Sequence, residues 1–432
     1  MHVDPITLAD LEVLVARDGG PGILDMVDST RTRVGRQALQ RRLTRPLGTV
    51  EEIRAVQAAL PRLIGPHPID HITEEAIQRT ERYIGSNVLP SRGVGGTWAR
   101  LAELWMRMRY PAVLTELREG QVALRELTAF GRRLASRLLS DAPPSLLRGF
   151  GERLADRTSE VDRALSSGPI LNTDRIVRED LREEVLEIIG ILGELDALRS
   201  MALAGEARGW VRPELVDSPD FLLEAEGAYH PFLTGAHPNP IALNGGEPLV
   251  FLTGPNMAGK TTYLKTAGLL VLLAQTGMDV PASAVRLAPI EVLFTSLDPA
   301  DNLRDGISYF YAEILRVREA AEILAEGRTA MVLFDEVFKG TNVKDAIEAS
   351  AQVIRGFART RRSGSIFSSH LSELFDTLRT DPAVRFCQFD GEVVGGVPVF
   401  DYKLASGVSE KRFGLLLLEQ ARIPELIARI TA

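Results

Sequence analysis

A glycine-rich segment has the residue types and spacing to hold a chain of phosphates. Residues 254–261 read Gly-Pro-Asn-Met-Ala-Gly-Lys-Thr and fit the pattern G-x-x-x-x-G-K-[ST]. The apolar run 249–253 before it predicts a strand, and residues 262–275 after it predict a helix. Glycines let successive backbone N–H groups turn toward phosphate oxygens, and the helix N-terminus adds partial positive charge. The expected phosphate-binding residues are Gly254, Pro255, Asn256, Met257, Ala258, Gly259, Lys260, Thr261 and Thr262.

A second acidic element would complete such a site. Lys260 is expected to reach the β- and γ-phosphate oxygens of ATP, and the Thr261 hydroxyl to ligate Mg²⁺. Asp335 and Glu336 follow the apolar run 330–334, at the carboxyl edge of a predicted strand, where ligands bind in doubly wound sheets. Asp335 is predicted to assist Mg²⁺ binding and Glu336 to be the general base. Adjacent acids after a strand are often only a helix cap, but the phosphate loop favours the catalytic interpretation.

Two further residues have a functional and a structural interpretation each. His370 follows a predicted strand at 365–369 and could contact the γ-phosphate or the attacking water, although a single histidine is more often structural. Asp345 follows Gly340-Thr341-Asn342 and could face a dimer partner or simply cap a helix. The sequence alone favours the functional interpretation of His370 because of its place after the strand.

The secondary structure predicted to position these residues differs between the two halves of the chain. Before Pro213, apolar residues recur every three or four positions, which predicts helices at 31–43, 50–63, 74–84, 97–108, 112–139 and 178–208. After Pro213, short runs at 249–253, 292–296, 330–334, 365–368 and 384–389 alternate with helical patterns. This predicts an α + α/β fold: a helical domain at 1–215, then a P-loop ATPase domain with a mostly parallel sheet at 216–432. A hairpin with Gly395-Gly396 at its turn is expected after the last parallel strand.

Bulk properties exclude several protein classes. The 432 residues carry a net charge of −8, are 45% hydrophobic and 25% charged, and contain one cysteine, Cys387. This composition argues against a disordered chain or an internal disulfide, and no apolar run has the length of a membrane span. We therefore expect no membrane partner and a cytoplasmic location, with nucleoid association left open. Residues 29–50 lack acids but contain six arginines, which could lie on phosphates or form a solvated helix face: Arg31, Arg33, Arg36, Arg41, Arg42 and Arg45.

The motifs together resemble those of the MutS family of DNA mismatch-repair ATPases. That family's loop typically reads G-P-N-M-G-G-K-S, and its D-E-x-x-x-G-T-[ST] appears here as residues 335–342. Residues 306–313 resemble the stretch in which a serine reaches the nucleotide bound by the opposite subunit, and Ser308 is the matching position. The closing patterns at 400–407 and 421–424 also match. The resemblance implies ATP and Mg²⁺ as ligands, a homodimer with composite sites and a C-terminal dimerisation segment.

The resemblance continues upstream but departs from complete family members. Residues 24–47 are similar to the start of the MutS core domain, and Tyr229-His230-Pro231 to the His-Pro at the entrance of its ATPase domain. A core-like segment this close to residue 1 implies a short member without the mismatch-recognition and connector domains and with a reduced clamp. Ala258 replaces a glycine, and Phe338-Lys339 replaces Gly-Arg, so the rate of hydrolysis is left open. The aromatic residue that stacks on adenine is not identified.

Three functions fit the sequence to different degrees. The leading hypothesis is a MutS-like ATPase that switches helical levers on double-stranded or branched DNA, without conventional mismatch reading. The alternative is a nucleotide-switched scaffold that holds protein partners and does not bind DNA directly. An ABC-transporter ATPase fits least well, because a Ser-Gly-Gly-Gln signature is absent from the sequence.

Overall fold

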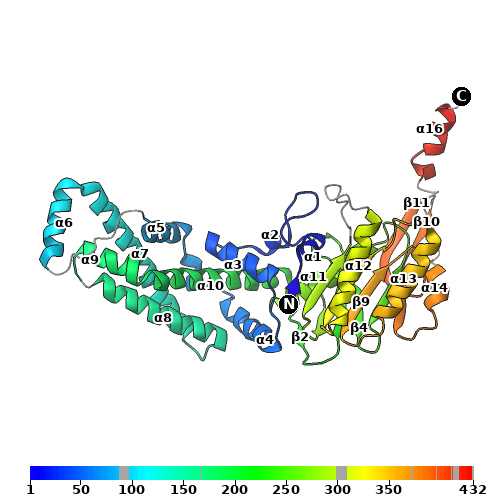
Figure 1. Ribbon diagram of the computed structural model, residues 1–432, viewed down its shortest axis with the longest axis horizontal. Coiled ribbons are helices and arrows are strands. Elements are labelled where there is room, and N and C mark those ends of the chain that lie inside the picture. Colours follow the sequence, from blue (N-terminus) through cyan, green and yellow to red (C-terminus); the bar gives the residue numbers. More distant parts are fainter. Residues whose placement is uncertain are drawn as a thin grey trace. The chain divides into compact units, whose positions relative to one another are not determined.

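The structure, a computed structural model, describes residues 1–86, 97–166, 168–297, 309–370, 373–395, 397–409, 411 and 418–430. The chain forms two compact units. The first contains Met1–Ile23, Leu43–Arg54 and Arg208–Ala432, and the second contains Leu24–Arg42 and Ala55–Ala207. Figure 1 shows strands gathered in the first unit and helices in the second.

A seven-stranded sheet is the centre of the first unit (Figure 1). Its order is β1-β7-β8-β9-β5-β10-β11, and every neighbouring pair is parallel except the hairpin of β10 and β11. Non-consecutive neighbours such as β9 and β5 require crossover connections, which helices supply. The strands are β1 (His2–Val3), β5 (Leu249–Thr253), β7 (Val292–Ser296), β8 (Ala330–Asp335), β9 (Ser363–Ser368), β10 (Val384–Val394) and β11 (Val397–Ser406).

Helices cover both faces of this sheet. Alternate side chains such as Val332 and Phe334 of β8 lie in an apolar core with side chains of α12, α13 and α14. Leu333, between them, points to the other face and approaches Gly268 of α11. Burial on both faces explains why these strands read as continuous apolar runs. The helices of this unit are α1 (Pro5–Asp10), α11 (Lys260–Gln275), α12 (Tyr309–Ala325), α13 (Val343–Phe357), α14 (Glu373–Leu378) and α16 (Ile423–Ile430).

A second, four-stranded sheet was not predicted from the sequence. Its order is β2-β6-β3-β4, from β2 (Glu214–Leu215), β6 (Ala284–Leu287), β3 (Leu222–Ala228) and β4 (Asn239–Asn244). The connection between β3 and β4 contains the His-Pro segment at 230–231. This sheet therefore supplies a loop that the functional site uses.

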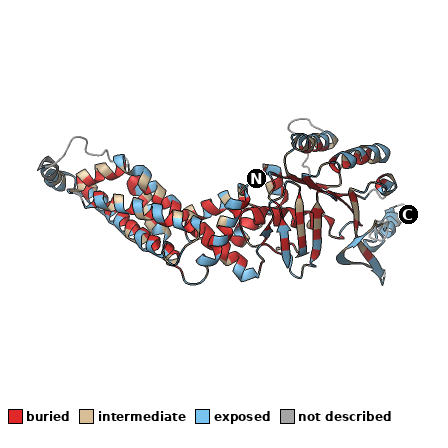
Figure 2. Ribbon diagram, turned by 90° about the horizontal axis from the view of Figure 1, so that it is seen from below, coloured by how far each residue is buried: buried red, intermediate tan, exposed pale blue. Residues whose placement is uncertain are grey.

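The described residues of the second unit form helices and no strand. Figure 2 shows the buried positions of these helices concentrated on the sides that face one another. Among the described residues, five α-helices lie entirely within the residue ranges of this unit: α5 (Glu74–Ile84), α6 (Thr97–Arg109), α7 (Pro111–Leu138), α8 (Ser145–Leu165) and α9 (Ile170–Arg175). The others are α2 (Ile23–Val27), α3 (Arg33–Thr44), α4 (Val50–Ala59), α10 (Arg182–Arg208), two 3₁₀ turns, Leu60–Leu63 and Pro68–His71, and a π-helical turn, Ile176–Asp180.

The long helix predicted at 178–208 begins later, at Arg182, because a π-helical turn precedes it. Its C-terminal half is buried at successive positions, so the predicted single apolar stripe does not describe it. Asp196 is buried there and accepts hydrogen bonds from the N–H groups of Arg31 and Thr32 and from the Thr32 hydroxyl. Burial raises the pKa of Asp196 in spite of these bonds. The carboxylate of one helix thus satisfies free N–H groups at the start of another.

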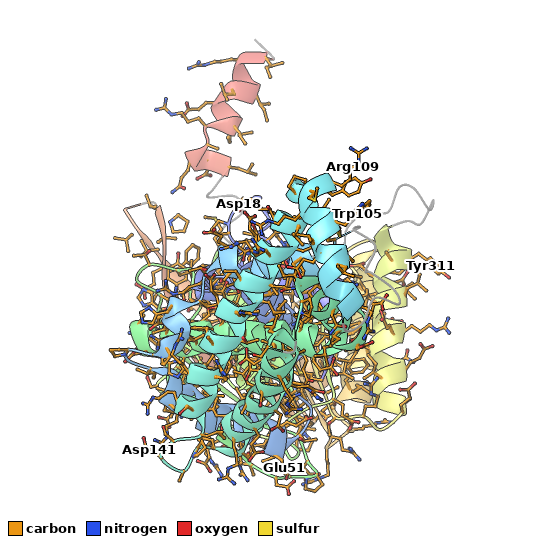
Figure 3. The ribbon with its side chains drawn as sticks, turned by 90° about the vertical axis from the view of Figure 1, so that its left-hand side faces the viewer. Asp18, Glu51, Trp105, Arg109, Asp141 and Tyr311 are labelled. Atoms are coloured by element: carbon orange, nitrogen blue, oxygen red, sulfur yellow. The ribbon has the colours of Figure 1, made fainter. Side chains whose placement is uncertain are left out.

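Ion pairs occupy much of the arginine-rich segment. Arg33 pairs with Glu81, Arg36 with Asp25 and Asp28, and Arg41 and Arg42 both pair with Glu194. These guanidinium groups therefore have carboxylate partners within the helical unit, and phosphates would have to compete with them. Elsewhere in the unit, Trp105 and Arg109 project from α6 (Figure 3), and Trp105 is 59% exposed.

The mixed α/β fold with a mostly parallel sheet, predicted from the sequence, is confirmed. The domain limits 1–215 and 216–432 stay a prediction; residues 1–23 and 43–54 belong to the same compact unit as the sheet. Among the described residues, no helix is both long and apolar enough to cross a membrane. The predicted hairpin is present as β10 and β11, although Gly396 of its turn lies outside the described residues.

Candidate functional site

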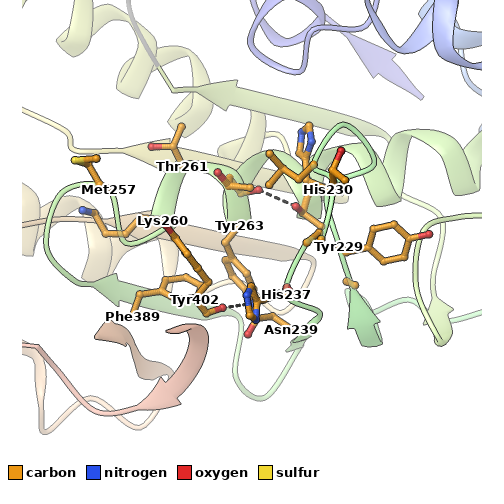
Figure 4. Close-up of a pocket in the computed structure, with 18 of the residues that line it drawn as sticks. Tyr229, His230, His237, Asn239, Met257, Lys260, Thr261, Tyr263, Phe389 and Tyr402 are labelled. Carbon is orange, nitrogen blue, oxygen red and sulfur yellow. Dashed lines mark hydrogen bonds between the residues drawn. The ribbon is translucent and has the colours of Figure 1, made fainter. Parts of the chain in front are cut away.

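A cavity of about 560 Å³ lies between the glycine-rich loop and the connection from β3 to β4 (Figure 4). Its volume is in the range of pockets that hold small ligands. One part of its wall contains Lys260, Thr261 and Glu336. Another part contains aromatic and imidazole rings: Tyr229, His230, His237, Tyr263, Phe389 and Tyr402.

The glycine-rich loop joins β5 to α11, as its sequence predicted. Gly259 precedes the helix with φ of 101°, a left-handed conformation that favours glycine, and Met257 also has a positive φ, of 71°. The Lys260 ammonium is buried and donates hydrogen bonds to the carbonyls of Gly254 (2.9 Å) and Pro255 (3.2 Å). Burial lowers the pKa of Lys260, and the charges of Glu336 and Asp335 oppose this effect. The loop therefore wraps around a cation at the start of a helix.

Asp335 ends β8 beside this loop. The Thr261 hydroxyl donates a hydrogen bond to one oxygen of Asp335, and the Ser368 hydroxyl donates to the other. Ser368 is the cross-strand partner of Asp335 in β9, so the parallel register itself places the two side chains together. A threonine hydroxyl and a carboxylate are hard oxygen ligands of the kind that Mg²⁺ prefers. Sequence reasoning missed Ser368, whose position depends on strand order.

Glu336 lies next to three cationic or protonatable side chains. Its carboxylate is 2.7 Å from the Lys339 ammonium and 3.9 Å from the Lys260 ammonium, and it also contacts Nε2 of His370. Burial alone would raise the pKa of Glu336, but the bonds and charges of His370 and Lys339 lower it to about 2. The backbone of Glu336 is held at φ of 55°, with its N–H bonded to the Ser368 carbonyl. A left-handed conformation at a glutamate is uncommon and is often found at functional sites.

The structure thus brings Lys260, Thr261, Asp335, Glu336 and His370 together. Ser308 lies outside the described residues.

Of the two interpretations left open for Asp345, the structure contradicts the helix N-cap. Asn342 is the N-cap of α13, and its side chain accepts a hydrogen bond from the N–H of Asp345. Asp345 occupies the third helical position, where a negative charge suits the helix N-terminus.

A pair of rings that the sequence did not identify lies in the same cavity. The centroids of His237 and Tyr402 are 5.7 Å apart, with 34° between the ring planes. Asn239 fixes Tyr402 by donating to its carbonyl (2.9 Å) and accepting from the N–H of Leu404 (2.7 Å). A Cβ atom added at Gly259 would lie 3.4 Å from the Tyr402 ring, so this ring borders the phosphate loop.

Comparison with known proteins agrees with this geometry. Residues 250–431 match the family model of MutS domain V. The C-terminal half of the chain is therefore similar to domain V of MutS proteins. The resemblance predicted from the sequence is therefore confirmed over the C-terminal half.

Two MutS relatives show the extent of the similarity. The DNA mismatch repair protein MutS of Geobacillus sp. (strain WCH70) is 31% identical over 258 residues, which are 57% of this chain and 30% of that protein. The MutS protein of Chlamydia pneumoniae is 34% identical over 254 residues, 56% of this chain and 30% of that protein. The chain therefore matches less than a third of the length of these relatives.

Proposed function

We propose that this protein binds ATP with Mg²⁺ and hydrolyses it. The observation that carries the proposal is that Lys260, Thr261 and Glu336 line one cavity, with the Thr261 hydroxyl bonded to Asp335. Each group has the chemistry that phosphoryl transfer to water requires: a cation for the phosphates, oxygen ligands for a metal and a base for water. The MutS domain V match supports the same reaction class.

The phosphate loop and its lysine hold the triphosphate. The Lys260 ammonium exchanges its bonds to the Gly254 and Pro255 carbonyls for phosphate oxygens, which carry more negative charge. Backbone N–H groups of the loop and of the first turn of α11 are the expected further donors to these oxygens. Thr261 and Asp335 hold Mg²⁺, which when bound neutralises charge on the phosphates. Ser368 orients the Asp335 carboxylate through its hydrogen bond.

Glu336 accepts a proton from the attacking water, and His370 holds the Glu336 carboxylate in position and contacts the γ-phosphate or its water. Because the pKa of Glu336 is about 2, the carboxylate is ionised at neutral pH and ready to accept a proton. Its low basicity predicts slow hydrolysis, since a base works best when its pKa is near the working pH. Beside the phosphate loop, Tyr402 and His237 offer ring faces for the adenine to stack on.

The biological action that we infer is a switch. A homodimer completes each site with Ser308 of the opposite subunit, and nucleotide turnover moves the helical unit on double-stranded or branched DNA. The name of the relatives, DNA mismatch repair protein, supports DNA as the partner. One observation favours the alternative, a protein scaffold that does not bind DNA: Arg33, Arg36 and Arg42 are already paired with carboxylates.

The test compares ATP turnover with no DNA and with homoduplex, mismatched and junction DNA. We expect Mg²⁺-dependent turnover that Lys260→Ala abolishes and that at least one DNA stimulates. Binding to that DNA should weaken steeply as salt increases, because phosphate contacts release counterions. Turnover without any DNA effect or binding would favour the scaffold, and absence of both ATP binding and turnover would refute the enzyme assignment.

A further inference from the structure

A β-bulge carries the ring that borders the phosphate loop. In the ladder of β10 and β11, residues 401–403 of β11 lie opposite the single residue Asp390 of β10. A bulge leaves backbone groups without a partner on the neighbouring strand, redirects a side chain and is frequent beside functional sites. Tyr402, in the middle of this bulge, has φ of 55°, which is uncommon for a bulky residue. The ladder with β10 therefore does not by itself determine where the Tyr402 ring lies.

Asn239, the first residue of β4, binds the backbone at this bulge (Figure 4). Its side-chain amide donates to the Tyr402 carbonyl (2.9 Å), and its side-chain oxygen accepts from the N–H of Leu404 (2.7 Å). The same amide donates to the carbonyl of His237 (3.2 Å), whose ring is next to that of Tyr402. Asn239 is 8% exposed, so water competes little for these bonds. One buried side chain thus fixes both residues whose rings are neighbours in the cavity.

The position of the Tyr402 ring depends on these backbone bonds, because side-chain packing holds the ring only in part. Tyr402 is 40% exposed, and the rings of His237 and Phe400 have their centroids 5.7 and 6.1 Å away. Residues in sparsely populated conformations persist only where the surrounding structure enforces them, and they cluster at ligand-binding sites. The Asp401 side chain supports the turn by accepting from an N–H within the bulge (3.0 Å). Asn239 belongs to the other sheet, so its bonds also fix the ring relative to the cavity.

We propose that Asn239 is a positioning residue that holds the Tyr402 ring where the base of a nucleotide stacks. The site thereby prefers a nucleoside triphosphate to inorganic triphosphate. This inference rests on the proposed function, which stacks the base on this ring. The loop around Lys260 binds the phosphates of either ligand, and only the ring distinguishes the two, since stacking requires a flat base. Asn239 acts through Tyr402, because both polar atoms of its side chain are bonded to backbone groups.

The experiment measures equilibrium binding of ATP and of inorganic triphosphate, both with Mg²⁺, to the full chain and to the variants Asn239→Ala, Asn239→Leu and Tyr402→Ala. We expect Tyr402→Ala to weaken ATP binding by about fivefold to 150-fold, the range for the loss of one stacked base. Each Asn239 variant should weaken ATP binding by at least about threefold, because the ring is displaced, and should change the binding of inorganic triphosphate by less than about twofold. Asn244→Ala is the matched control. It removes the asparagine at the other end of β4, which accepts from the N–H groups of Gly246 and Glu247, and should change the binding of neither ligand.

A double variant shows whether Asn239 acts through Tyr402. Adding Asn239→Ala to Tyr402→Ala should weaken ATP binding further by less than about twofold, because no ring remains to be positioned. Full additivity of the two losses would mean that Asn239 affects the nucleotide by another route, and the inference would be wrong.

Other results would also overturn the inference. Equal loss of ATP and inorganic triphosphate in both Asn239 variants would mean that this residue only supports the cavity as a whole. If the unmodified chain binds neither ligand, the proposed function fails together with the inference. If it binds ATP and the Asn239 variants do so equally well, only the inference fails. Leucine keeps the approximate volume of asparagine, so a loss shared by both variants reports the hydrogen bonds and not an empty space.

Discussion

Replacement of Glu336 by glutamine separates ATP hydrolysis from ATP binding. Glutamine keeps the size of the side chain but cannot accept a proton from water at neutral pH. General bases contribute about 10²–10⁴-fold to enzyme rates, which corresponds to about 2.7–5.5 kcal/mol of activation free energy. We therefore expect kcat to fall by at least about a hundredfold.

ATP binding should survive or become tighter in the same variant. The Glu336 carboxylate is 3.9 Å from the Lys260 ammonium. At an effective dielectric constant of about 20, two unit charges at that distance interact by about 4 kcal/mol before desolvation is counted. Without the carboxylate, the Lys260 ammonium keeps more of its positive potential for the triphosphate. We therefore expect the variant to bind ATP up to about tenfold more tightly. Displacement of a fluorescent ATP analogue by ATP would measure this change in affinity.

The Glu336→Gln substitution should also change how the stability of the folded chain depends on pH. Because the folded chain lowers the pKa of Glu336 from 4.5 to about 2, the carboxylate stabilises the folded state above pH 4.5. That contribution is lost as the pH falls from about 4.5 toward 2. Glu336→Gln should therefore lose less stability than the unmodified chain between pH 5 and 3, as thermal melts at several pH values would show. Unchanged turnover in a folded Glu336→Gln variant would refute the assignment of this residue as the base.

Three further substitutions test the site and the packing around it. Asp335→Asn should abolish the additional thermal stabilisation that Mg²⁺ gives to the ATP complex while ATP alone still binds, and an equal response to Mg²⁺ would argue against a metal ligand there. Gly268→Val should cost about 1–3 kcal/mol in urea unfolding, because even its first carbon would lie 2.8 Å from Leu11, whereas Gly356→Ala, with nothing within 4 Å, should be neutral or stabilising. Asp196→Ala should cost about 2–4 kcal/mol by leaving buried N–H groups unpaired, with Asp196→Asn closer to the unmodified chain; equal stability of all three would contradict the capping role.

The parts of the fold that could be predicted are those in which burial requires a continuous run of apolar residues in the sequence. The strands β5 and β7 begin and end at the predicted residues, because strands covered on both faces are apolar throughout. In the smaller sheet, β2 and β6 have two and four residues, too few to show a period, whereas β3 and β4, with seven and six residues, were long enough to be predicted and were missed. The π-helical turn before α10 was missed as well, since its residues have the same spacing as an ordinary helix.

In the candidate site too, the contiguous segment was predicted and the residues brought together by strand pairing were not. The phosphate loop is contiguous in the chain, so its spacing alone predicted it. Ser368 reaches Asp335 through the register of β8 and β9, and Tyr402 reaches the cavity through the pairing of β11 with β10. His237 comes from the connection between β3 and β4 of the smaller sheet, whose strands were not predicted. Only tertiary structure brings these residues together, so no local pattern could have indicated them.

The path of the chain between the two compact units has a practical consequence. Residues 1–23 and 43–54 belong to the unit that contains the phosphate loop, so the chain passes between the units four times. Within that unit, the Gln275 side chain of the loop's own helix donates to the Leu47 carbonyl, and Lys265 of the same helix pairs with Glu12. A fragment that starts at residue 216 would lose both partners and uncover the side of α11 that Leu11 covers. Biochemists who prepare the C-terminal half alone should therefore expect poor solubility and weak nucleotide binding, and would do better to keep the intact chain.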